Sequence, residues 1–469
     1  MRTEREKCAH LLRRFGLGAS ESELDYYSQG GLSSAVDKLL DYEKTPEVLH
    51  IELKRFAQRD NNRINMVGVQ GWWTLKLITT RRPLLEKMTL FWHDHFATSA
   101  SKVVQPGLMF QQNQLLRKHA TGRFRDLLLE ASQDPAMLFW LDNQYNVKGK
   151  PNENFAREVM ELFTLGIGNY TEKDVQEAAR AFTGWSYRRV NGQDALLKEQ
   201  PNAEFLYRRN LHDDEPKTVL GTTKNLTGEE VIDMLCDHPQ TARYLTTKLW
   251  EWFVYPKPEK GVIDKLAGRF RTSGLNIREL LRDIMTDPEF YSDRAHRAVV
   301  KNPIDFVVPT LRQAGIGELL AAALANTEEM PPVARGVVGA VQQATRSMGM
   351  TLLFPPDVDG WPGGESWISS ATIVERIAWG ERLFGQSAGG RRLQVRAPAF
   401  PLMSSETTPE GAVRRLLSIF DAPIPESKLP PLIEAAKNAS GGTVTQRNAN
   451  AVAGKVCRLV FGSPEFQFS

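Results

Sequence analysis

Apolar residues recur at helical spacing through most of this chain, and that periodicity limits the fold more than any other sequence feature. In the segment RRPLLEKMTLFWHDHFA, the residues Met88, Trp92 and Phe96 fall on one stripe of a helix. The segments QQNQLLRKHATGRFRDLLLEAS, NENFAREVMELFTLG and YTEKDVQEAARAFTGW repeat the pattern, and Gly166 and Gly184 mark two of the ends. The first 185 residues therefore predict a body of packed helices.

The helical pattern stops between Trp185 and Thr227. The pair Asn191-Gly192 lies there between short runs, which is a signal for a β-hairpin. Helices resume with TGEEVIDMLCDHPQTARYLTTKLWEWFV, whereas LLFPPDVDGWPGGESWISS holds too many prolines and glycines for the interior of an element. We therefore expect a mainly α chain, with a large multi-helix body and a small β-hairpin or ordered-loop insertion near residues 186–226.

These changes of pattern divide the chain into four segments. Its 469 residues suffice for two or three cores or for one large helical domain. Residues 1–185 are expected to form an N-terminal helical region with the candidate site, and residues 186–227 the insertion. Residues 228–390 are expected to form a second helical region packed on the first, including the Pro/Gly/Trp loop 354–367. Residues 391–469 are expected to form a C-terminal linker and small helices.

The charge balance and the cysteines exclude several classes of protein. The chain has 59 basic and 56 acidic residues, a formal net charge of +3, and no basic stripe, which argues against a nucleic-acid binder. Its three cysteines lie far apart, so no local disulfide framework or CxxC knuckle is present. No apolar run approaches the roughly 18 residues of a membrane helix, and the N-terminal segment lacks the apolar core of a signal peptide. We expect a soluble, cytoplasmic protein.

The stretch FWHDHFATSA contains an H-x-H spacing that is common in metal sites. On a helix, His93 and His95 lie about 160° apart and cannot ligate one metal together. The metal interpretation therefore requires the helix to end by His93, because residues two apart share a face in an extended chain. The alternative is a continuous helix with a buried His95 that binds a backbone group and an exposed His93. His95 is the histidine on the apolar side in either case.

A polar stripe runs along the helix predicted for NENFAREVMELFTLG. Asn154, Glu158 and Glu161 follow one another on this stripe, and Arg157 lies beside Glu161. Glu158 borders Leu162, so partial burial is expected to raise its pKa unless a cation compensates. Two carboxylates on one stripe, joined by a histidine from another helix, are the ingredients of a metal site in a helix bundle. The alternative is a solvated face of glutamate and arginine.

Two loops add further candidates. The segment NLHDDEPKTVLG offers His212 and Asp213 as imidazole and oxygen ligands, although acidic turns are often only solvated. In PPDVDGWPGGESW, Trp361 and Trp367 are predicted either to line a pocket or to fasten the loop onto the body. The chain has no G-x-G-x-x-G after a strand, no G-x-x-x-x-G-K-[ST], no G-x-S-x-G and no H-E-x-x-H, so common nucleotide-dependent and nucleophile-elbow chemistries are not favoured.

Several of these segments together resemble one known family. HLLRRFGLGAS, FWHDHFATS, DPAMLFWLDN, NENFAREVMELFTLG, YTEKDVQEAARAFTGW, HDDEPKTVLG and FPPDVDGWPGG run in the family's order over most of residues 9–380. The chain is similar in this way to the bacterial family of uncharacterised proteins called domain of unknown function number eighteen hundred. The resemblance implies that the shared polar positions belong to a site, but it supplies no reaction, metal or substrate.

Three functional hypotheses remain open, and the sequence does not decide whether the chain is an enzyme. The first is a metal-dependent enzyme with a divalent Zn, Mn or Fe ion and an unknown small-molecule or peptide ligand. Its predicted residues are His93, His95, His212 and Asp213 as metal ligands, Glu158, Glu161 and Arg157 as catalytic groups, and Asn154, Trp361 and Trp367 as substrate-binding groups. The second is a metal-free scaffold that binds a peptide or protein and contains a buried polar network. The third is non-covalent haem binding by a histidine on a helix.

Overall fold

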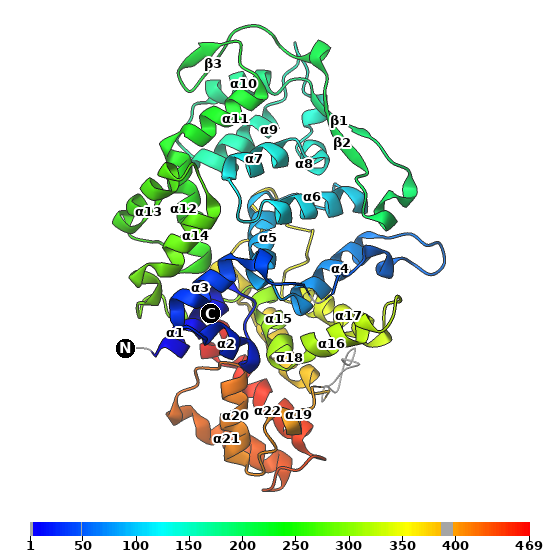
Figure 1. Cartoon of the computed structure of the whole chain (residues 1–469), viewed down its shortest axis with the longest axis vertical. Coiled ribbons are helices and arrows are strands. Elements are labelled where there is room, and N and C mark those ends of the chain that lie inside the picture. The colour runs from blue at the N-terminus through cyan, green and yellow to red at the C-terminus, as the bar shows by residue number, and fades with distance from the viewer. Residues whose placement is uncertain (1–2, 48, 386–396) are drawn as a thin grey trace.

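The computed structural model describes residues 3–47, 49–385 and 397–469 (Figure 1). In these residues, helices α1 to α22 account for most of the chain, and the strands form only two sheets of two strands each. The predicted mainly α fold with a small β insertion is confirmed. None of the described helices has the length and apolar character that crossing a bilayer requires.

The first half of the chain begins as the periodicity predicts. Its elements are α1 (Glu4–Phe15), α2 (Glu21–Ser28), α3 (Gly31–Leu40), α4 (Met66–Thr79), α5 (Pro83–His95), α6 (Pro106–Lys118), α7 (Phe124–Ser132), α8 (Pro135–Trp140), α9 (Glu153–Met160), a π-helix η4 (Glu161–Leu165) and α10 (Glu172–Ala181). Pro83 occupies the first turn of α5, and Thr171 and Asp174 cap α10 reciprocally, because both residues suit a helix N-terminus. Local sequence signals therefore position these helix starts.

The insertion contains two hairpins rather than one. Strand β1 (Trp185–Arg189) pairs antiparallel with β2 (Ala203–Tyr207), and β3 (Lys217–Val219) pairs with β4 (Thr222–Lys224). Asn191-Gly192 does not form a tight turn between β1 and β2, because residues 190–202 connect them through a short 3-10 helix. The two-residue turn is Leu220-Gly221, where both φ angles are positive, at 45° and 79°.

The second half of the chain is helical again. It contains α11 (Gly228–Asp237), α12 (Pro239–Phe253), α13 (Lys260–Thr272), α14 (Ile277–Thr286), α15 (Pro303–Gln313), α16 (Ile316–Ala325), α17 (Pro332–Ser347), α18 (Ser370–Leu383), α19 (Ala399–Leu402), α20 (Pro409–Ile419), α21 (Leu429–Ser440) and α22 (Ala449–Gly462). The C-terminal helices lie together at one end of the molecule, and the end of the chain returns to α1 (Figure 1). The expected linker falls partly on residues 391–396, which lie outside the described residues.

Helix α5 lies between the two apolar cores. Met88, Phe91 and Trp92 belong to a core with α1, α3 and α7 to α14, whereas Leu90 belongs to a core with α4, α6 and α15 to α22. Two charged residues of α5 are also buried: Glu86 is 1% exposed and Lys87 3% exposed. Buried charges need partners, and Arg117 binds both oxygens of Glu86 while Asp305 binds Lys87. The helix is therefore enclosed on all sides.

Candidate functional site

The last turn of α5 carries both histidines of the H-x-H stretch. Because α5 continues to His95, the two rings leave the helix on different sides, and both are buried. The Nε2 atom of His95 donates a hydrogen bond to the carbonyl oxygen of Phe163 at 3.2 Å, since a carbonyl can only accept. The Nε2 atom of His93 has no hydrogen-bond partner among the described residues, and its ring lies edge-on to Trp73 and Trp361.

These positions decide between the two interpretations of the stretch. The predicted backbone partner of His95 is present, but the predicted exposure of His93 is wrong. Trp361, distant in the sequence, covers the side of α5 that helical periodicity leaves open. Burial lowers the pKa of His93 to about 3 and the pKa of His95 well below its usual range, so both rings are neutral at physiological pH.

The helix that faces His95 changes its winding at the site. Residues Glu161–Leu165 form a π-helix, a rare element that is frequent at functional sites. Two of its carbonyl groups are bound by side chains from other helices: Phe163 accepts from His95 of α5, and Leu162 accepts from the hydroxyl of Tyr244 of α12 at 2.9 Å. The π-helix therefore joins α5 to α12, and the predicted helix end at Gly166 is confirmed.

Five ionisable residues from α5, α9, η4, α12 and the 354–367 loop are linked by charge interactions that act on Asp94, Glu158 and Lys248. We call them the carboxylate cluster: Asp94, Glu158, Glu161, Asp359 and Lys248. Asp94 and Asp359 both act on Lys248, and Glu161 and Asp359 both act on Glu158. The cluster therefore assembles segments that are far apart in the sequence.

The cluster perturbs two carboxylic acids in the same direction. Burial, together with the charges of the neighbouring Glu161 and Asp359, raises the pKa of Glu158 to about 7, although Arg157 partly offsets them. Burial also raises the pKa of Asp94 to about 6, against the backbone N–H of Trp361 and the charge of Lys248. Both acids therefore titrate near neutral pH, unlike ordinary surface carboxylates.

Lys248 is the cation of the cluster. Its Nζ lies 5.5 Å from the centre of the Tyr244 ring, and in the described part of the chain no carboxylate comes within ion-pair distance of it. Burial lowers the pKa of Lys248, while Asp94, Asp359 and Glu251 raise it. The amine is therefore a stronger proton donor than an ordinary lysine.

The loop reaches α5 through Asp94. The carboxylate Oδ1 of Asp94 accepts a hydrogen bond from the backbone N–H of Trp361 at 2.8 Å. Gly360, with φ of +89°, lies so close that a Cβ atom there would be 2.4 Å from the same oxygen. Only glycine allows the loop to approach this carboxylate without displacement.

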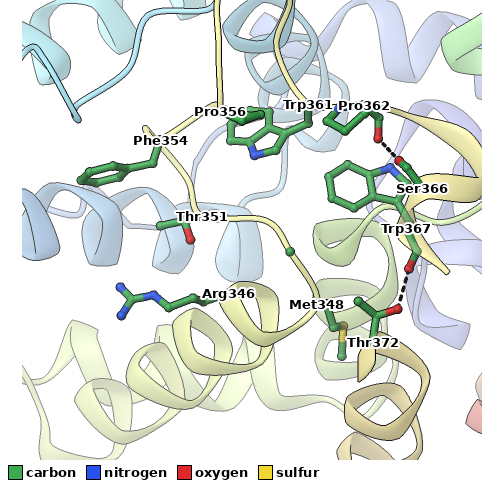
Figure 2. A pocket seen from close by; sticks show the side chains of 11 residues that line it. Arg346, Met348, Thr351, Phe354, Pro356, Trp361, Pro362, Ser366, Trp367 and Thr372 are labelled. Atoms are coloured by element: carbon green, nitrogen blue, oxygen red, sulfur yellow. Dashed lines mark hydrogen bonds between the residues drawn. The ribbon is translucent and has the colours of Figure 1, made fainter. Parts of the chain in front are cut away.

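The same loop forms one wall of a cavity of about 540 Å³. In Figure 2 the side chains of Phe354, Trp361 and Trp367 come from the loop, and Arg346 lies across from them on α17. Trp361 connects the cavity to the carboxylate cluster, because its side chain lines the cavity while its backbone N–H donates to Asp94. Both predicted tryptophans thus lie in the wall of one cavity beside the carboxylate cluster.

Other predicted residues are bound elsewhere. Arg157 does not pair with Glu161; its guanidinium binds Glu172 at 2.7 Å and Glu153 at 3.3 Å. Glu161 instead accepts from the hydroxyl of Tyr170. The amide of Asn154 donates to the carbonyl of Leu141 at 3.3 Å. Arg157 and Asn154 therefore fasten neighbouring segments in this structure.

His212 and Asp213 lie at the junction of α10 with the insertion. Asp213 accepts two hydrogen bonds from Arg180, at 2.8 and 3.1 Å, and the Nδ1 atom of His212 donates to the carbonyl of Thr183 at 2.9 Å. Within the described residues, no group of three or more His, Cys, Asp or Glu side chains is placed to hold a metal ion. The four predicted metal ligands therefore do not assemble into one coordination sphere.

Four residues at the site were not predicted from the sequence: Asp94, Lys248, Tyr244 and Asp359. A signal existed for Lys248, which follows the buried Leu245 by three positions and so borders the apolar face of α12. Asp359 offered no such signal, because a loop has no periodicity from which its neighbours could be predicted. Tyr244 and Lys248 are one turn apart and reach the same place.

Comparison with known proteins identifies the family. Residues 10–468 match the family described as "Protein of unknown function (DUF1800)", so the chain belongs to that family over nearly its whole length. No curated protein and no solved structure matches the chain.

Proposed function

We propose that in this family member the carboxylate cluster is the acid–base centre of an enzyme, and that the adjoining cavity binds its substrate. The observation that carries the proposal is the pair of carboxylic acids whose pKa values are raised to about 6 and about 7 beside a lysine of lowered pKa. General acids and bases work best when their pKa lies near the working pH. Perturbed groups of this kind are concentrated in functional sites.

The surroundings suggest different roles for the two acids. Glu158 is half-buried and receives no hydrogen bond from the described residues, so its carboxylate is free to exchange a proton with a substrate. Asp94 accepts a hydrogen bond from the N–H of Trp361, which favours a role in positioning this wall of the cavity. Lys248 is suited to stabilise negative charge that develops on the substrate.

The cavity favours a substrate with an aromatic or otherwise apolar part. Trp361 and Trp367 are each only 7% exposed but contribute ring surface to its wall, and Phe354 adds a third ring. Arg346 provides a cation at the opposite wall. A reaction that removes or delivers a proton at such a substrate, such as hydrolysis by an activated water, matches these residues. The proposed acid–base chemistry does not depend on a metal ion.

The proposal is tested first by titration of the acids themselves. Carbon-detected NMR of the glutamate and aspartate carboxyl groups should place the pKa of Glu158 near 7, with the signal assigned by its loss in Glu158→Gln. A Glu158 that titrates near its ordinary value of 4.5 would remove the basis of the proposal. The same titration detects Asp94 independently.

Activity is tested next with chromogenic esters, anilides and glycosides that carry aromatic groups. Once turnover is found, Glu158→Gln should lower kcat by about 100-fold or more, because a general acid–base group typically contributes that much. Glu410→Gln, an exposed carboxylate on α20, is the matched control and should leave kcat unchanged. Equal activity of Glu158→Gln and the control would contradict the proposed role.

A second candidate function is ligand binding without chemistry. The observation that favours it is the cavity itself, with three aromatic rings and an exposed Arg346 that has no ion pair within the described residues. Tryptophan fluorescence would then respond to an aromatic peptide or acid in wild-type protein and in Glu158→Gln alike. Loss of this response in Trp367→Ala, with retention in Glu158→Gln and no turnover of any substrate, would favour binding over catalysis.

A further inference from the structure

A second, smaller cavity, with none of the carboxylate cluster in its wall, lies where the two ends of the described chain meet. Its volume is about 100 Å³, and it is bounded by α1, α15, α20 and the last residues of the chain. Figure 1 shows the end of the chain returning to α1, directly above the C-terminal helices. The charged residues of its wall are Arg13, Glu21, Lys301, Asp305 and Asp421.

Lys301 is the unusual residue of this wall. Only 8% of it is exposed, yet in the described part of the chain its ammonium group has no carboxylate within ion-pair distance. The Nζ atom lies 3.6 Å from the centre of the Phe466 ring, which provides a cation–π contact but no counter-charge. Burial, together with the charges of Arg297 and Arg13, lowers the pKa of Lys301 well below its usual range, although Asp421 acts in the opposite direction.

The carboxylates of the wall are already bound to other cations. Asp305 binds Lys87, and Glu21 binds Arg415. Asp421 is shared by two guanidinium groups, since it accepts from Arg13 at 2.6 Å and from Arg297 at 3.0 Å. Arg13, the neighbouring Arg297 and Lys301 therefore share Asp421, so that positive charge exceeds negative charge locally around this carboxylate.

We propose that this cavity binds a small tetrahedral oxyanion, such as inorganic phosphate or sulfate, with Lys301 and Arg13 as its charged ligands. An enclosed cation without a counter-charge is costly, and a bound anion removes that cost. The cavity volume of about 100 Å³ leaves room for an ion of this size. Gln313 and Ser418 supply neutral donors in the same wall.

Such an anion would link parts of the chain that are distant in sequence. Arg13 belongs to α1, Lys301 immediately precedes α15, and Asp421 follows α20. The bound ion would therefore stabilise the packing of α20 and of the last residues of the chain against the rest of the molecule. This role is independent of the carboxylate cluster, so either proposal can fail while the other stands.

The test compares anions at constant ionic strength. Thermal unfolding and isothermal titration calorimetry of the full chain are measured in phosphate, sulfate, acetate and chloride. Phosphate and sulfate should raise Tm by about 2 °C or more relative to chloride, as expected for a ligand that binds only the folded state. Lys301→Met should lose this response, whereas Lys437→Met, which removes an exposed lysine of α21, should keep it.

Three outcomes would overturn the proposal. The first is equal Tm in phosphate and chloride with no heat of phosphate binding, which would mean that Lys301 is simply neutral. The second is a response to acetate alone, which would assign the cavity to a carboxylate. The third is an unchanged phosphate response in Lys301→Met. If Lys301→Met does not fold, Lys301→Arg, which keeps the charge, and the wild-type titration still decide, because both should bind phosphate.

Discussion

In the loop before β3, Asp213 binds Arg180 and Asp214 binds Arg209, whereas Asp94 and Glu158 in the carboxylate cluster have no ion-pair partner among the described residues. The two regions look equally acidic in the sequence. In the structure, Arg180 lowers the pKa of Asp213, while burial and neighbouring carboxylates raise the pKa of Glu158. The presence of an arginine partner, rather than the number of acidic residues nearby, therefore distinguishes a carboxylate that stabilises the fold from one that is available for chemistry.

The largest expected effect comes from breaking the contact between the loop and the cluster. Gly360→Ala would place a Cβ atom 2.4 Å from Oδ1 of Asp94 at a residue whose φ is +89°. We expect a loss of about 3 kcal/mol in the free energy of unfolding, measured in urea, because both the clash and the backbone strain must be relieved. Gly363→Ala, in the same loop with negative φ and open space, is the control and should be nearly neutral. Equal stability of the two variants would show that Asp94 does not hold the loop.

The second largest effect is expected from removal of the ion pair between Arg180 and Asp213. Arg180→Met leaves Asp213 without its partner while the carboxylate remains only 15% exposed. The free energy of unfolding should fall by about 2 kcal/mol, less than for a fully buried pair because both side chains retain some contact with water. Arg209→Met removes an exposed pair nearby and should leave the free energy of unfolding nearly unchanged. If both variants lose the same amount, Asp213 has no special structural role.

The sequence predicted what local signals control. The first turn of α5 at Pro83 and the reciprocal cap of α10 by Thr171 and Asp174 were predicted correctly, because each depends on residues within one turn. The polar stripe of α9 also led to Glu158, since its border with Leu162 predicted partial burial and a raised pKa.

Contacts between distant segments could not be predicted in this way. His93 is buried because Trp361 covers it, and Glu86 is buried because Arg117 satisfies it. A single sequence contains no information on either pairing, so charged and polar residues of a central helix look like a solvated face. Asp359 could not be predicted for the same reason, because it reaches the site from a loop that is distant in sequence from α9 and α12.

The smallest expected effect is a change with pH in the contribution of Glu158 to the free energy of unfolding. Glu158 has a pKa of about 7 in the folded protein and its ordinary value of 4.5 when unfolded. The folded state therefore binds more protons between these values, and the contribution of Glu158 to stability falls as pH rises through this window. Glu158→Gln removes this loss of stability at high pH. The variant should therefore be more stable than wild type by about 1 kcal/mol near pH 8, a value that allows for solvent screening of a half-exposed group. Near pH 4.5 the two proteins should be almost equally stable.

Asp213→Asn should behave in the opposite way. The pKa of Asp213 is lowered in the folded protein, so its contribution is present above its ordinary value of 3.8 and is lost as pH falls below it. The variant should be less stable than wild type by about 1 kcal/mol near pH 8, and the difference should shrink in acid. Urea unfolding of both variants over the pH range measures whether each one is more or less stable than wild type. Destabilisation by Glu158→Gln near pH 8 would mean that Glu158 has an unidentified partner and belongs with the structural carboxylates.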